Sequence, residues 1–324
     1  MTLYRELREF PTTLRGAGVL VPTAELPMSV NAARWRAARS RIARPYRGLY
    51  LLGPTPPDLA DLAKAALAVA PPHAVVGFHT AAALLGFGVV TSADVHLVVP
   101  AGTAFPQRRG ITVHQSVVPI GPFAVRGIRC TSPARTAIDL ARVLPRPDAL
   151  AVLDAALASQ TCTPAELAEE VRRHRRLKGF RQASALVPLA DGRAECAQET
   201  HLRLILRDAR ITSLVPQVPV RDRYGRVLYR LDLADEHLRV AAEYDGLSHL
   251  DRDRLRTDRA RHNFLAAQHW RMRYFTDVDL YRRPDYVVRT VRAALADALA
   301  DARARCGRVP GAPPPMDGSP RTTI

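Results

Sequence analysis

The sequence predicts a mixed α/β (α+β) protein with three successive domains. Its 324 residues are enough for two or three compact domains with cores of their own. The apolar fraction of 47% is ordinary for a globular protein. Helical and strand patterns alternate between the boundary stretches "PTPPD" and "ADGR". We therefore expect domains at residues 1–56, 57–190 and 191–300, followed by a disordered Pro- and Gly-rich tail at 301–324.

The net charge of +16 favours a polyanionic partner, nucleic acid above all. Forty-seven basic residues face 31 acidic ones. All the basic residues except Lys64 and Lys178 are arginines, so a GC-rich genome is an alternative source of this charge. No apolar run reaches the ~18 residues of a membrane span, and the N-terminus has no secretory signal. Four cysteines without a CxxC pair favour a reduced, cytoplasmic compartment.

The first domain has the pattern of a winged helix-turn-helix. Ser29 is a good N-cap for a basic helix, and the stretch "PYRGLYLL" that follows reads as a strand carrying Arg47. In a winged helix the helix enters the major groove and the wing contacts phosphates or the minor groove. A solvated helix face beside an ordinary strand is the alternative. The candidate DNA contacts on this helix are Arg34, Arg36, Arg39 and Arg41.

The pattern of the middle domain predicts an α+β fold in which Ser132 or Thr131, before Pro133, starts a helix. Three histidines stand singly in apolar patterns and are interpreted as structural: His79, His96 and His114. The domain ends in the basic run "VRRHRRLKGFR", which contains no acid. A solvated face and phosphate contact are both open for this run. Its candidate DNA contacts are Arg172, Arg173, Arg175 and Arg176.

Three motifs occur in order along residues 1–190: "RPYRGLYLL", "FHTAAALLG" and "TSPARTAIDLAR". In these motifs and their order the segment resembles the AbiEi-type antitoxins. This resemblance implies DNA binding by the winged-helix domain and does not itself imply catalysis.

The third domain places three carboxylates among apolar strand residues. A helix over 194–210 is followed by strands with acids in "RLDLAD" and "VAAEYDG". Period-two alternation predicts that Leu231 and Leu233 face one side, opposite Asp232, and that Glu243 and Asp245 share the side of Asp232. Like charges this close raise one another's pKa, and a divalent cation would remove the cost. Oxygen ligands suit Mg²⁺ or Mn²⁺.

This pattern resembles a PD-(D/E)xK nuclease core, and specifically the very-short-patch-repair-endonuclease-like domain. The resemblance spans about 105 residues, with "D…ExDGxxH", a D-x-x-R helix and a Trp-containing strand in order. It implies a restriction-endonuclease-like mixed sheet flanked by helices. Asp232 and Glu243 would be metal ligands, joined by the helical Glu199. His249 would be a general base or phosphate contact, and Arg259 a phosphate contact.

One departure from the nuclease pattern concerns the motif lysine. Asp245 stands at that position, and residues 191–324 contain no lysine. Asp245 could be a further catalytic metal ligand or a partner of His249. The related repair endonucleases also lack the lysine and use histidine.

Three functions therefore stay open. The first is a Mg²⁺-dependent endodeoxyribonuclease that the winged helix holds on DNA. The second is a non-catalytic DNA-binding regulator or antitoxin of AbiEi type with a degenerate nuclease fold. The third is an RNA-directed nuclease. A toxin or repair partner would be additional to DNA, and no membrane is expected.

Overall fold

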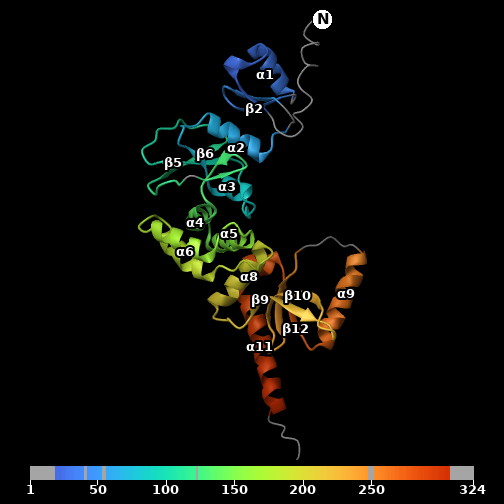
Figure 1. Ribbon diagram of the computed structural model, residues 1–324. Helices are drawn as coiled ribbons and strands as arrows, with labels where there is room; N and C mark the ends of the chain where they lie inside the picture. The colour runs from blue at the N-terminus through green and yellow to red at the C-terminus, as the bar shows by residue number, and fades with distance from the viewer. Residues whose placement is uncertain (1–18, 40–41, 53–55, 122, 247–251, 307–324) are drawn as a thin grey trace, which may run out of the picture. The chain divides into compact units, whose positions relative to one another are not determined.

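The computed structural model describes residues 19–39, 42–52, 56–121, 123–246 and 252–306. The chain forms two compact units, Met1–Thr200 and His201–Ile324. The two domains expected at 1–56 and 57–190 thus belong to one compact unit. The mixed α+β class expected from the sequence is confirmed (Figure 1).

The N-terminal segment packs one helix, α1, against a three-stranded antiparallel sheet of order β1-β3-β2. Ser29 caps α1 by accepting a hydrogen bond from the Ala32 amide at 3.3 Å, as expected. Ala33, Ile42 and Tyr50 form the core of this segment. The elements are β1 (Val19–Pro22), the 3-10 helix η2 (Thr23–Glu25), α1 (Val30–Ala38), β2 (Ala43–Tyr46) and β3 (Leu49–Leu52).

The next segment is a small mixed sheet of order β4-β5-β6, in which β5 pairs parallel with β6. Residues 95–99 of the central strand β5 are all buried, as expected of a strand covered on both faces. The elements are α2 (Leu59–Ala68), β4 (Val75–Val76), α3 (Phe78–Leu84), β5 (Val95–Pro100), β6 (Ile111–Ser116), β7 (Ala124–Val125) and β8 (Ile128–Arg129).

A helical layer completes the N-terminal unit, with α4 as its most buried member. Ser132 caps α4 and Pro133 occupies its first turn, which confirms the expected helix start. Residues 133–141 of α4 are all buried. The elements are α4 (Pro133–Val143), α5 (Arg146–Ala158), α6 (Pro164–Arg173), α7 (Phe180–Leu186) and the 3-10 helix η3 (Val187–Leu189).

A buried ionic network joins α4 to α6. The Arg135 Nε lies 2.6 Å from the Asp139 Oδ2, and both side chains are buried. The other Asp139 oxygen accepts from Arg142 Nη1 at 3.0 Å. His174, with no exposed surface, bonds Glu170 through Nε2 at 2.9 Å. The buried charges thus carry partners of opposite sign, which is the condition under which a charge can be buried.

The C-terminal unit is built on a four-stranded mixed sheet of order β12-β11-β10-β9. Only the β11–β12 pair of this sheet is parallel, because α9 carries the chain between those strands. The elements are α8 (Ala197–Asp208), β9 (Val215–Arg221), β10 (Val227–Asp235), β11 (Val240–Tyr244), α9 (Arg252–Ala267), β12 (Arg271–Phe275), α10 (Asp277–Arg282) and α11 (Pro284–Cys306).

Helices cover both faces of this sheet, and α9 and α11 are seen on opposite sides of it in Figure 1. One core cluster joins Leu233 and Phe275 to residues of α8, α10 and α11. The other joins Leu231 and Trp270 to Leu265 of α9. The buried Trp270 confirms its expected place in the core.

The expectation that Leu231 and Leu233 face the same side is wrong, because they belong to opposite core clusters. The reason lies between them. The Asp232 carboxylate accepts the Tyr244 amide of the neighbouring strand at 2.9 Å, as a backbone carbonyl of the ladder would. The regular pairing of β10 with β11 runs only from Leu233↔Ala242 onward. Alternation therefore does not continue through Asp232.

The expected start of the disordered tail is also wrong, because α11 continues through Cys306. The alanines and arginines of this stretch favour a helix there, and the Pro-rich sequence begins later. Residues 307–324 lie outside the described residues.

No helix within the described ranges is long and apolar enough to cross a membrane.

The network in α4 predicts very different stability effects for two acid-to-alanine substitutions. Asp139→Ala removes the nearer acid partner of the buried Arg135, leaves only Glu170 at 3.9 Å from its Nε, and should lower the free energy of unfolding by about 3–5 kcal/mol. Glu169→Ala removes only exposed ion pairs with Arg172 and Arg173, which water and salt screen, so it should leave the free energy of unfolding nearly unchanged. Urea denaturation followed by circular dichroism measures both, and equal destabilisation would contradict the prediction.

Candidate nucleic-acid interface and acidic cluster

Helix α1 presents an exposed basic and aromatic face. Arg34, Trp35 and Arg39 are all exposed, and the Arg39 guanidinium lies 4.0 Å from the centre of the Trp35 ring. Arg36 is half-buried instead and donates to the Met28 sulfur at 3.3 Å. Trp35 was missed at the level of sequence, although the stretch "ARWRAARS" places it between two arginines. The remaining candidate on this helix, Arg41, lies outside the described residues.

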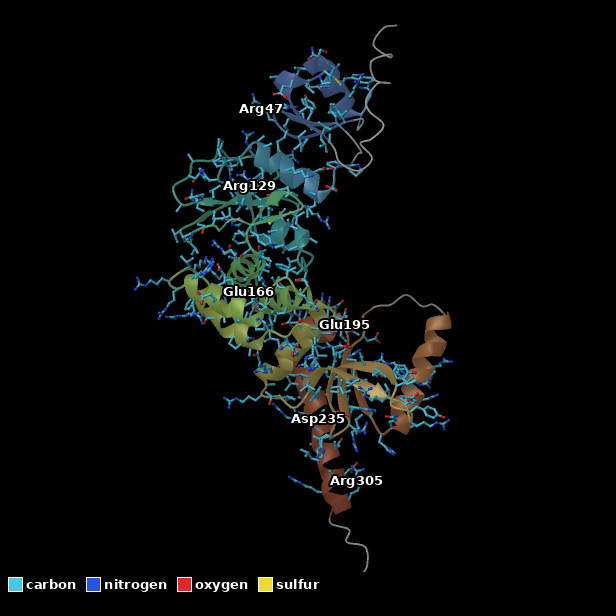
Figure 2. All side chains as sticks on the ribbon, viewed as in Figure 1. Arg47, Arg129, Glu166, Glu195, Asp235 and Arg305 are labelled. Carbon is cyan, nitrogen blue, oxygen red and sulfur yellow. The ribbon has the colours of Figure 1, made fainter. Side chains whose placement is uncertain are left out.

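Arg47 lies at the tip of the β2–β3 hairpin, where a wing would present it (Figure 2). Tyr46 and Leu49 pair across the turn, and Gly48 between them has a φ of +89°. This left-handed conformation favours glycine and keeps the turn tight. Arg47 is exposed. It thus has the position and exposure that phosphate contact requires.

The basic run of the middle domain is partly neutralised by acids just before it. Arg172 lies 2.5 Å from Glu169, and Arg173 lies 3.5 Å from Glu170. The sequence run itself contains no acid, but α6 brings the preceding turn's carboxylates alongside it. The arginines beyond the helix end, Arg175 and Arg176, are exposed. The field of this run is therefore weaker than its composition suggests.

The acids of β10 and β11 form one interacting cluster, here called the acidic cluster: Asp232, Glu243 and Asp245. Burial above all, joined by the charges of Asp232 and Asp245, raises the pKa of Glu243 to about 7, against the lowering effect of Arg261. Glu243 is buried, Asp232 is half-buried and Asp245 is exposed. Asp232 and Asp245 therefore interact electrostatically with Glu243, and the convergence of all three carboxylates on one metal ion stays a prediction.

The cation facing this cluster is Arg261 on α9, which was not among the residues predicted from the sequence. Its Nη2 forms an ion pair with the Glu243 Oε1 and also donates to the Arg230 carbonyl at 3.2 Å. Its Nε is buried with no hydrogen-bond partner. Arg261 is the arginine of the D-x-x-R pattern that begins at Asp258. That pattern is the signal in the sequence that points to Arg261 rather than to Arg259.

Of the other predicted nuclease residues, the structure describes Glu199 and Arg259. Glu199 is buried in α8, where its Oε2 accepts the Glu195 amide at 2.9 Å, and it belongs to the N-terminal unit. Arg259 is exposed on α9. His249 lies outside the described residues. Within the described part of the chain, no three acidic, histidine or cysteine side chains are grouped as a metal site.

Three histidines that stand apart in the sequence meet in the middle domain. The His96 Nδ1 lies 2.9 Å from the His114 Nε2, and the His96 Nε2 lies 2.8 Å from the Ser92 hydroxyl. The His79 and His96 ring centres are 4.7 Å apart. Burial lowers the pKa of all three rings, that of His96 to about 4. The structural role expected of them is consistent with this packing, but their mutual contact was missed.

Comparison with known proteins places this chain in a family. Residues 74–189 match the family described as "AbiEi antitoxin C-terminal domain". The "Uncharacterized protein Rv2248" of Mycobacterium tuberculosis strain ATCC 25618 / H37Rv is 36% identical over 213 residues, covering 65% of this chain and 78% of the relative. The "Uncharacterized protein MT2308" of strain CDC 1551 / Oshkosh gives the same values.

The histidine cluster predicts that the N-terminal unit becomes less stable in acid. The folded-state pKa values lie below the ordinary 6.5, so the unfolded chain takes up protons first as the pH falls from about 6.5 toward 4. Asp94 and Asp139 oppose this shift for His96 and His114 without reversing it. Unfolding midpoints measured between these pH values should fall less steeply for His96→Gln than for the wild type. The exposed His73→Gln serves as the control, and an unchanged slope in His96→Gln would refute the prediction.

Proposed function

Since the chain belongs to the family of these mycobacterial relatives and carries an AbiEi antitoxin C-terminal domain, we propose that it is a DNA-binding regulator of antitoxin type. The observation that carries this proposal is the exposed face of α1, where Arg34, Trp35 and Arg39 stand together. Arginine forks bind phosphates bidentately, and an indole ring adds a stacking surface. Arg47 at the hairpin tip provides the contact expected of a wing.

The remaining parts of the proposal follow from the family. An antitoxin-type regulator acts in the cytoplasm, where DNA and a cognate toxin protein are both its partners. The net charge of +16 supports the DNA partner, because phosphate neutralisation by basic side chains releases counterions. The basic run from Arg172 to Arg176 would make additional backbone contacts through the two arginines not paired with acids, Arg175 and Arg176.

Duplex binding at several salt concentrations tests this function. Arg34→Ala/Arg39→Ala should weaken binding and reduce the slope of log affinity against log salt by about 0.9 for each phosphate that the variant no longer neutralises. Fluorescence anisotropy with labelled promoter DNA measures both. Arg303→Ala/Arg305→Ala, which removes two exposed arginines from α11, is the matched control. No salt-dependent duplex binding by the wild type would refute the DNA-binding function.

The acidic cluster favours a second function, that of a metal-dependent nuclease of PD-(D/E)xK, very-short-patch-repair-like type. Asp232, Glu243 and Asp245 would supply oxygen ligands of the kind that Mg²⁺ or Mn²⁺ prefers, and they would have to draw closer together than they lie in this structure to share one ion. A bound cation would activate water and stabilise charge on the scissile phosphate. Arg261 would supply the positive charge that the motif lysine supplies elsewhere, and it would have to share Glu243 with the metal. The roles predicted from the sequence for Glu199, His249 and Arg259 belong to this second function and stay predictions.

Plasmid nicking decides between catalysis and binding alone. If the nuclease function holds, the wild type with Mg²⁺ or Mn²⁺ should nick supercoiled plasmid, and Asp232→Asn and Glu243→Gln should lower the rate by at least about 100-fold. Arg303→Ala/Arg305→Ala should nick at the wild-type rate. Equal activity in the wild type and both acid variants would exclude catalysis at this cluster and leave the regulator as the function.

A further inference from the structure

Two Arg-Gly turns, one on the hairpin and one on the middle domain, have the same construction. In the first, Tyr46 and Leu49 pair across Arg47-Gly48. In the second, the Ile111 amide donates to the Arg108 carbonyl at 3.1 Å across Arg109-Gly110. Both glycines have left-handed backbones, with φ of +89° and +81°. Glycine at this position lets the turn stay tight while the arginine beside it points away from the strands.

The two turns border one groove of about 1050 Å³, here called the arginine groove. Its walls carry four arginines: Arg44, Arg47, Arg108 and Arg109. Tyr46 connects the turns, because its hydroxyl donates to the Gly110 carbonyl at 3.5 Å. A Cβ built on Gly110 would lie 3.7 Å from the Tyr46 ring, so the ring packs against that turn. The groove is therefore formed jointly by the N-terminal segment and the segment that holds the β4-β5-β6 sheet.

The charge in the arginine groove is uncompensated by its own walls. No aspartate or glutamate lines the groove, and among the described residues none of its four arginines is in an ion pair. The Arg108 Nε is buried with no hydrogen-bond partner. Burial and the charge of Asp94 raise the pKa of Tyr46 to about 12, so Asp94 is the acid that acts on this part of the groove. Its carboxylate accepts the Thr112 hydroxyl at 2.8 Å and is not part of the wall.

Four guanidinium groups around one open groove repel one another, and no carboxylate of the walls offsets that repulsion. An anion with several oxygens relieves this cost. Phosphate suits arginine well, because two phosphate oxygens can accept hydrogen bonds from one planar guanidinium fork. The groove spans two turns rather than one, so it suits more than one phosphate in succession. We propose that the arginine groove is a binding site for linked phosphates, supplied either by a nucleic-acid backbone or by the phosphate chain of a nucleotide.

This site does not require the proposed function, because only the nucleic-acid source depends on it. The full chain is titrated with inorganic triphosphate by calorimetry and with labelled duplex by anisotropy. Arg108→Ala/Arg109→Ala should weaken at least one of the two at least tenfold, while Arg303→Ala/Arg305→Ala stays within twofold of the wild type. Weakening in the duplex arm alone assigns the site to the nucleic-acid backbone, and weakening in the triphosphate arm alone assigns it to a nucleotide.

Three results separate failure of this site from failure of the proposed function. Duplex binding that depends on Arg34 and Arg39 but not on Arg108 and Arg109, with no triphosphate binding, overturns the groove and leaves the regulator standing. If the wild type binds triphosphate but not the duplex, and the groove variant abolishes triphosphate binding, the groove stands and the DNA-binding regulator is overturned. No binding of either probe overturns both. Circular dichroism checks the fold of the double variant, and Arg109→Ala, at an exposed position, replaces it if that variant does not fold.

Discussion

The N-terminal unit depends on the buried pairing of Arg135 with Asp139. Burying an isolated charge costs several kcal/mol even after relaxation, so helix α4 can occupy the centre of this unit only if its charges are matched. Asp139 meets this need by accepting from Arg135 with one oxygen and from Arg142 with the other. Arg135 also donates to the Ser116 hydroxyl at 2.7 Å, which joins the helix to the end of strand β6. The stretch "TSPARTAIDLAR" is therefore a packing motif, and its functional effect is to hold the sheet and helical layer together.

Local features of the fold were predictable from the sequence because local chemistry determines them. Ser29 and Ser132 cap helices through hydrogen bonds to amides three residues ahead, and such bonds need no tertiary contact. The pairing of the strands that carry Asp232 and Glu243 also followed from the short turn between them. The placement of Leu231 and Leu233 in opposite cores was not predictable in this way. It depends on the Asp232 side chain, whose carboxylate accepts the Tyr244 amide of the neighbouring strand.

Contacts between distant elements were not predictable in the same way. His79, His96 and His114 come from a helix and two strands, and each looks like an isolated core residue along the chain. Arg261 reaches Glu243 only because α9 lies over the strand that carries that acid. Its guanidinium keeps positive charge beside the acidic cluster in a unit that has no lysine. The negative charge of the acidic cluster is therefore partly balanced by Arg261, although Asp245 stands where the nuclease pattern has a lysine.

The parallel pairing of β11 with β12 has a consequence for biosynthesis. A parallel neighbour can join only after its crossover has been made, so β11 leaves the ribosome well before Arg271–Phe275. Until then β11 is an edge strand with open backbone donors and acceptors, and it carries the apolar residues Val240, Ala241 and Ala242. Glu243, which follows them, places a charge on that temporary edge. A charge at the edge of an apolar strand is the feature by which proteins disfavour pairing between chains, so the buried centre of the acidic cluster stands where such a charge is useful during synthesis.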